Sequence, residues 1–185
     1  MVILVRTEAR RLVAAVVLCA VVGGCGAEPE PPRPVQPSST APVVPVVDRP
    51  VRLGDVSKGA CAVVPAHAVQ AVGFEEPGLG DGPRCGWRRT SFDAKTLEIV
   101  LYPDRDILRE VYASGKQVGP EFIPMMKADL PAVVEAPDGV HCTLTIGLSD
   151  RQGIQLTTTK LSRDGDNCST VLEVAEALVV TLRGR

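Results

Sequence analysis

Apolar and polar residues alternate along several stretches of this chain, and the alternation predicts β-strands. In 97–102 Leu97, Ile99 and Leu101 alternate with Glu98, Val100 and Tyr102. In 140–148 one side of the strand carries Cys142, Leu144, Ile146 and Leu148, and the other carries His141, Thr143 and Thr145. Three further segments have strand character: 84–91, 132–136 and 154–160.

Apolar residues spaced three or four apart predict helices in three other places. The first helix follows Pro65, which suits a first helical turn, and Gly73 ends it. The second opens at Pro103, and the last is capped by Asp166 or Asn167. The residues that share the buried faces are Ala68, Val69 and Val72; Ile107, Leu108, Val111 and Tyr112; and Val171, Val174, Ala175, Leu178 and Leu182.

The resulting order of elements is α-β-β-α-β-β-β-α. Consecutive strands joined by short turns pair antiparallel, as at the turn 137–139. We therefore expect an α+β domain with an antiparallel sheet of about five strands packed with helices. The remaining stretch, 115–131, is expected to be a long connection.

The first 25 residues have the layout of an exported lipoprotein. Basic Arg6, Arg10 and Arg11 precede an uncharged apolar run over 12–22, which is too short to span a membrane. The run ends in Val-Gly-Gly before Cys25, as in a bacterial lipobox. We expect a signal peptide over 1–24 and a lipid anchor on Cys25; the alternative is an ordinary secretory signal cleaved near Ala27.

A proline-rich linker follows over 25–50. Proline fixes φ and removes amide donors, so this segment favours an extended spacer over a helix or a central strand. The valine pairs at 43–44 and 46–47 are the part of it that could dock on the domain, but we do not expect them to. The rest of the chain, 51–185, has the length of a single domain.

Four cysteines remain once Cys19 leaves with the signal and Cys25 takes the lipid: Cys61, Cys85, Cys142 and Cys168. An even number in an exported domain predicts two disulfides, for which three pairings are open. We favour 61–85 with 142–168, because each bond would join a terminal helix to a strand close in sequence. Zinc is the alternative, but the chain has no C-x-x-C pair and export disfavours free thiolates.

Charge and motifs argue against several function classes. Without the signal peptide the formal net charge is −4, so no basic excess exists to bind nucleic acid. The sequence has no H-E-x-x-H, no G-x-S-x-G, no P-loop and no G-x-G-x-x-G that opens a helix. His67 is expected on an exposed helix surface, and His141 is expected to point away from the core. We expect no enzyme activity, no cofactor and no metal site.

Other clusters of chemistry-bearing residues have structural explanations. Asp104, Asp106 and Glu110 are interpreted as acidic residues at a helix start rather than as a calcium site. The glycine-rich segment 78–82 is interpreted as a turn, because prolines flank it and a strand follows.

Two features suggest a binding surface. Within the long connection, Phe122, Met125 and Met126 could line a groove for a lipid or form a partner surface. The favoured interpretation is that Phe122 and Ile123 close the open face of the sheet. The second feature is Trp87 with arginines at 84, 88 and 89, which suggests an anionic contact or simply a solvated strand face.

Several short motifs occur together in a distinctive order: Cys-Ala-Val-Val-Pro at 61–65, Gly73, Cys-Gly-Trp at 85–87, Cys142, and Asp-Asn-Cys at 166–168. With the lipobox and linker, this pattern resembles the actinobacterial lipoproteins grouped as domain of unknown function 3558. The resemblance implies an envelope lipoprotein with two disulfides and no assigned chemistry. The element order is also similar to the Mog1/PsbP-like fold, which at the level of fold analogy implies a binding scaffold.

These observations together predict a protein tethered by a lipid on Cys25 to the outer face of the cytoplasmic membrane. We expect a non-catalytic binding or adapter module that engages another envelope protein. The alternative is a carrier that holds a lipid or other apolar small molecule between sheet and helices.

Overall fold

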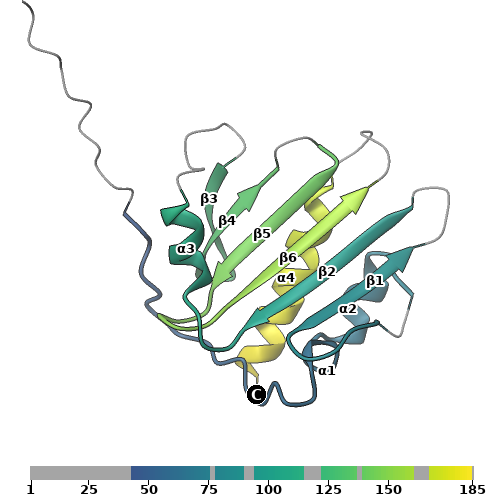
Figure 1. Ribbon diagram of the computed structural model, residues 1–185, viewed down its shortest axis with the longest axis horizontal. Helices are drawn as coiled ribbons and strands as arrows, with labels where there is room; N and C mark the ends of the chain where they lie inside the picture. The colour runs from purple at the N-terminus through teal and green to yellow at the C-terminus, as the bar shows by residue number, and fades with distance from the viewer. Residues whose placement is uncertain are drawn as a thin grey trace, which may run out of the picture. The chain divides into compact units, whose positions relative to one another are not determined.

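Six antiparallel strands form one sheet in the order β1-β2-β6-β5-β4-β3 (Figure 1). The computed structural model describes residues 43–75, 78–89, 94–114, 122–136, 139–160 and 167–184. The strands are β1 Arg84–Arg89, β2 Lys95–Tyr102, β3 Phe122–Lys127, β4 Leu130–Glu135, β5 His141–Gly147 and β6 Gly153–Lys160. The helices are α1 Ala60–Val63, α2 Ala66–Ala71, α3 Ile107–Ala113 and α4 Cys168–Arg183. The predicted α+β class is confirmed, with six strands in place of five.

The additional strand, β3, lies in the segment that was expected to be a long connection. It pairs with β4 from Phe122 opposite Glu135 to Lys127 opposite Leu130. The turn between them consists of Ala128 and Asp129, with φ of 48° and 59°. Two-residue hairpin turns with positive φ usually carry Asn-Gly or Asp-Gly, so the sequence gives no hairpin signal here. Residues 115–121 lie outside the described residues.

One face of the sheet is covered by α1, α2 and α4, and the main core lies between them (Figure 1). The alternating residues predicted for 97–102 and 140–148 supply the sheet side of this core. The helix side comes from the predicted apolar stripe of α4, in which Val171, Val174, Ala175 and Leu178 are all fully buried. Burial of this stripe holds the sixteen-residue helix on the middle of the sheet.

The opposite face is covered only in part. There α3 packs over β5 and β6, and Leu108, Tyr112 and Val133 form a second small core. Thr145 points away from the main core as predicted, yet it is fully buried, on the face that α3 partly covers. One valine of each pair in the linker docks, contrary to the expectation: Val44 packs on this cluster and Val47 on the main core. Over β1, β2 and the adjoining part of β6 no described helix covers this face (Figure 1).

Two disulfides join helices to strands with the favoured pairing. Cys61 in α1 bonds to Cys85 in β1, and Cys142 in β5 bonds to Cys168 at the start of α4. The Cα–Cα separations of 5.0 and 5.3 Å are ordinary for disulfides. The bonds therefore fix both ends of the helical layer to the sheet.

The helix starts differ in detail from the prediction. Two short helices flank Pro65 where one was expected, and Gly73 follows the second with φ 82°. The second predicted helix starts at Ile107 rather than at Pro103, because Asp106 caps it by accepting a hydrogen bond from the Arg109 amide at 3.0 Å.

Asn167 occupies the N-cap position of α4 but its side chain does not cap the helix. Its amide instead donates to the carbonyls of Val140 and Thr158, at 2.6 and 3.2 Å. Asn167 therefore links α4 to the sheet by hydrogen bonds instead of capping the helix as predicted. The other candidate cap, Asp166, lies outside the described residues.

Candidate binding surface on the open face of the sheet

The strand register determines which side chains lie on the face opposite α4, here called the open face. Successive residues of a strand point to opposite faces, and paired residues share a face. The open face therefore carries three rows across β1, β2, β6 and β5. These rows are Arg84, Val100, Gln155 and Thr145; Gly86, Glu98, Thr157 and Thr143; and Arg88, Thr96, Thr159 and His141.

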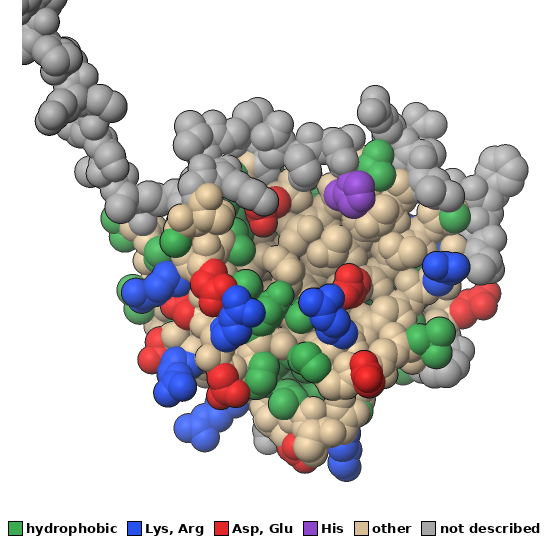
Figure 2. All heavy atoms as spheres, in the orientation of Figure 1, with side chains coloured by type: hydrophobic (Ala, Val, Ile, Leu, Met, Phe, Trp, Pro, Cys, Tyr) green, Lys and Arg blue, Asp and Glu red, His purple; other side chains and the backbone are tan. Residues whose placement is uncertain are grey.

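Hydroxyl and amide groups dominate the middle of these rows and bond to one another. Thr143 Oγ1 and Thr157 Oγ1 are 3.1 Å apart, and the Gln155 amide donates to Thr145 Oγ1 at 3.2 Å. The Tyr102 hydroxyl donates to Gln155 Oε1 at 3.3 Å. A hydroxyl can donate once and accept twice, so this network retains capacity for a ligand. Figure 2 shows the face as mainly uncharged, with groups of both signs around the uncharged area.

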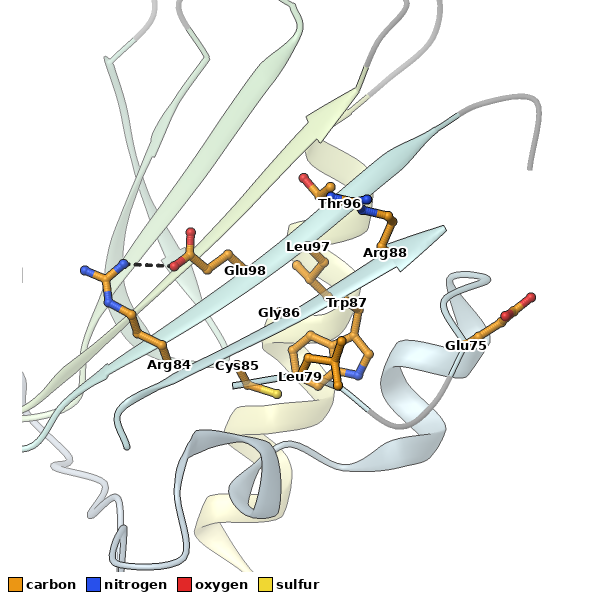
Figure 3. Close-up of a pocket in the computed structure, with 10 residues that line it drawn as sticks. All are labelled: Glu75, Leu79, Arg84, Cys85, Gly86, Trp87, Arg88, Thr96, Leu97 and Glu98. Carbon is orange, nitrogen blue, oxygen red and sulfur yellow. Dashed lines mark hydrogen bonds and ion pairs between the residues drawn. The ribbon is translucent and has the colours of Figure 1, made fainter. Parts of the chain in front are cut away.

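A hollow of about 720 Å³ lies at the corner of the open face, where β1 forms the edge of the sheet (Figure 3). We call it the corner hollow. Gly86 has no side chain, so the residues around it stand above an open floor. The lining residues are Glu75, Leu79, Arg84, Cys85, Gly86, Trp87, Arg88, Thr96, Leu97 and Glu98.

Among the described residues, the charges around the corner hollow are only partly paired. Arg84 forms an ion pair with Glu98 at 2.9 Å, and both side chains are about half exposed or more. Arg88 is exposed on the same face of the same strand. Exposed ion pairs contribute little to stability, so Arg84 and Glu98 can exchange partners at low cost.

A short segment, Gly78-Leu79-Gly80, lies along the outer edge of β1; we call it the strap. Leu79 and Gly86 exchange two backbone hydrogen bonds of 2.8 Å, which form an isolated antiparallel bridge. The Leu79 side chain is 79% exposed, whereas Trp87 is 4% exposed. The indole Nε1 of Trp87 is buried without a hydrogen-bond partner among the described residues.

The arginines predicted to surround Trp87 do not form one cluster. Arg84 and Arg88 lie on the open face, whereas Arg89 lies on the helix face with Trp87. Only the first two line the corner hollow. Only the end of the segment 78–82 forms the predicted turn, where the Arg84 amide bonds to the Asp81 carbonyl; the rest pairs with the edge of β1, which its glycine content did not indicate.

Phe122, Met125 and Met126 do not gather around one cavity among the described residues. Phe122 packs edge-on against Tyr112, with ring centroids 5.2 Å apart, and joins the second core. Met125 points to the other face and packs on the main core, while Met126 is 62% exposed. Phe122 therefore closes part of the sheet face, as the favoured interpretation held, whereas Ile123 is 50% exposed and does not.

The candidate catalytic and metal-binding residues also have structural positions. His67 is exposed on α2, and His141 is exposed at the border of the open face, as predicted. Asp106 caps α3, and Glu110 pairs with Arg105, which raises the pKa of that guanidinium mainly through the hydrogen bond. Within the described part of the chain, no three His, Cys, Asp or Glu side chains come together in a way that could hold a metal ion.

The open-face residues that sequence reasoning missed are Gly86 and the threonines. Threonines at 143, 145, 157 and 159 occur at every second position in two strands that prove to be neighbours. Their spacing was visible in the sequence, but their assembly into rows required the register. Across the described ranges, no helix is long and apolar enough to cross a membrane.

Comparison with known proteins identifies one family. The family model described as "Protein of unknown function (DUF3558)" matches residues 20–181. No curated protein and no solved structure shows significant similarity to the chain.

Proposed function

Because the chain belongs to the DUF3558 family, whose description assigns no activity, we propose a function from its own sequence and surface: it is a non-catalytic binding module, tethered to the outer face of the cytoplasmic membrane, that engages another envelope protein. The observation that carries the proposal is the open face. It is a rigid, polar surface with a hollow at one corner, and no described helix covers its β1–β2 side.

The tether is supported by the sequence around Cys25. A basic start, a short apolar run and small residues before this cysteine are typical of lipoprotein signals. An acyl-glycerol anchor adds about 0.8 kcal/mol per buried methylene, so two or more chains hold a protein firmly at a membrane. The proline-rich linker would then hold the domain away from the lipid surface, where a protein partner can reach it.

Two disulfides in the domain agree with an oxidising, extracytoplasmic compartment. The net charge of −4 after signal removal disfavours nucleic acid as the partner. An apolar-ligand carrier has less support, because Phe122 and Met125 point to opposite faces of β3 and do not bound one cavity. A polar protein surface is the better match to the hydroxyl rows of the open face.

Native mass spectrometry of the protein extracted gently from its own envelope tests this proposal. We expect a chain that begins at a lipidated Cys25, with four oxidised cysteines and a protein partner that dissociates on denaturation. A small apolar molecule released instead of a protein would favour the carrier. A Cys25→Ala chain is the matched control, since it should be found free of the membrane. Absence of lipid on Cys25 would contradict the proposed location.

A further inference from the structure

The outer edge of β1 offers backbone groups that no other strand of the sheet uses. Gly86 directs both its N–H and its C=O outward, since both bond to Leu79 rather than to β2. Backbone direction repeats every second residue in an antiparallel strand, so Arg84 and Arg88 also direct theirs outward. The Arg84 amide bonds to the Asp81 carbonyl at 3.3 Å, whereas among the described residues nothing pairs with the outward backbone of Arg88.

The strap holds this edge by few interactions. It contributes one bridge, and its only large side chain, Leu79, is 79% exposed and so buries little. Beneath it the Trp87 Nε1 is left without a hydrogen bond, which destabilises the closed arrangement. The strap lies on β1 only because both flanking residues are glycine. A Cβ at Gly78 would be 2.5 Å from Trp87 Cε2, and one at Gly80 would be 2.4 Å from the Arg84 oxygen.

The other edge of the sheet is protected against strand addition. The two-residue turn makes Lys127 and Leu130 a hydrogen-bonded pair, so Pro124, three residues earlier, directs its backbone outward. Proline has no N–H, and a proline on an edge strand blocks pairing with another chain. Strand addition to this sheet is therefore favoured only at β1.

We propose that the partner binds by adding an extended segment to the edge of β1 and so displaces the strap. This mode of binding rests on the proposed function and extends it. Main-chain hydrogen bonds to Gly86 and Arg88 replace the Leu79 bridge, which is the usual mode of β-augmentation. Opening also uncovers the Trp87 indole, so that its N–H can meet an acceptor of the incoming chain.

Charge and shape specify the incoming segment. Cross-strand neighbours lie about 5 Å apart on one face, so residues opposite Arg84 and Arg88 are four positions apart. Opposite charge favours an acidic residue at each of these positions, above all opposite Arg88. The residue midway between them lies over Gly86, where the open floor of the corner hollow accepts a bulky apolar side chain. The expected pattern is acidic, any, bulky apolar, any, acidic.

A second copy of this chain is a poor fit to the same edge. The antiparallel register that uses all three outward residues of two β1 strands is centred on Gly86, and it would bring Arg84 of one copy opposite Arg88 of the other, where like charges are destabilising. The occupant is therefore an acidic segment of a different protein.

The test is selection of displayed random eight-residue peptides on the immobilised full chain. We expect selected peptides to carry the acidic–apolar–acidic spacing. Gly86→Pro removes the outward donor without touching the β2 ladder, and loss of that one main-chain bond should weaken binding by about two- to tenfold. Gly86→Ala keeps the donor and its Cβ meets only ordinary contacts at 3.6 and 3.8 Å, so it should bind more strongly than Gly86→Pro and lose only part of the fit of the bulky apolar side chain in the corner hollow.

Opening the strap should act in the opposite direction. Gly78→Ala cannot close over Trp87, so we expect it to bind the same peptides about threefold or more tighter; Gly184→Ala, whose Cβ has nearest neighbours at 3.7 Å, should bind unchanged. Arg88→Glu should weaken binding by about two- to fivefold or more. Should Gly86→Pro fail to fold, slowed amide hydrogen exchange at Gly86 and Arg88 on peptide addition decides in its place.

Several outcomes would overturn the inference: no enriched peptide, binding indifferent to Gly86→Pro or Gly78→Ala, or self-association of the chain that Gly86→Pro abolishes. These outcomes are separable from failure of the proposed function. A native envelope partner that crosslinks only at Thr143, with Gly78→Ala without effect, refutes strand addition and leaves the binding module intact. An extracted chain that holds no protein partner refutes the binding function itself.

Discussion

Loss of the Cys142–Cys168 disulfide gives a quantitative test of how the fold is held together. The bond joins β5 to the first residue of α4 across a sequence separation of 26. The loop-entropy relation assigns a cross-link of this span about 3.5 kcal/mol at 25 °C. For a domain of this size, that corresponds to a fall of about 7–14 °C in melting temperature. A Cys142→Ala, Cys168→Ala variant should show this loss in urea unfolding followed by circular dichroism.

The second disulfide provides the matched comparison. Cys61 and Cys85 are 24 residues apart, and the entropy term depends only on the logarithm of that span. The two double-alanine variants should therefore differ by less than about 0.5 kcal/mol from this term. Reduced wild type retains all four sulfur atoms and isolates the cross-links from packing. A combined loss below about 1 kcal/mol on reduction would refute the reasoning, as would a variant lacking all four cysteines that still responds to reductant.

Three further perturbations follow from burial and charge. Leu156 is fully buried in β6, so Leu156→Ala should lower the free energy of unfolding in urea by about 3–4 kcal/mol. Leu79 is exposed, so Leu79→Ala should change it by less than about 0.5 kcal/mol. Gly153→Ala should destabilise by about 1–3 kcal/mol, because its Cβ would lie 2.5 Å from a side-chain carbon of α3; unchanged stability would show that α3 shifts freely. The hydrogen bond from Lys127 lowers the pKa of Glu176 below its ordinary 4.5, so this carboxylate stabilises the fold above about pH 4.5 and the gain is lost as pH falls through the folded pKa. Glu176→Gln should accordingly flatten the stability profile in that acid range and leave it parallel to wild type near pH 7.

Period-two and helical patterns predicted five strands and the long terminal helix, because those segments bury one face against the main core. The sixth strand was missed for local reasons. Phe122–Lys127 contains a proline and two consecutive apolar residues on each side of it, without strict alternation, and its turn lacks the usual Asn-Gly. Its strand form depends on pairing with β4, a tertiary interaction that propensity does not report. The two helices on either side of Pro65 have only four and six residues, which is too short for helical periodicity to reveal the break between them.

The candidate site was less predictable than the fold. The arginines around Trp87 were noticed, but only the strand register separates Arg84 and Arg88 from Arg89. Gly86 belongs to the Cys-Gly-Trp motif, but the motif does not indicate that its missing side chain opens the corner hollow. The open face as a whole is built from strands that are not consecutive in the sequence. It becomes visible only once β2 is known to pair with β6.

Photo-crosslinking from the anchored chain in its own envelope tests the binding function most directly. A photoreactive residue at Thr96, exposed beside the corner hollow, is compared with one at Val180, which is 60% exposed on α4 on the far side of the sheet. The account predicts a discrete protein adduct from Thr96 that is absent from Val180 and is reduced when Arg88 is replaced by glutamate. Equal labelling from both positions, or an adduct from Val180 alone, would contradict it.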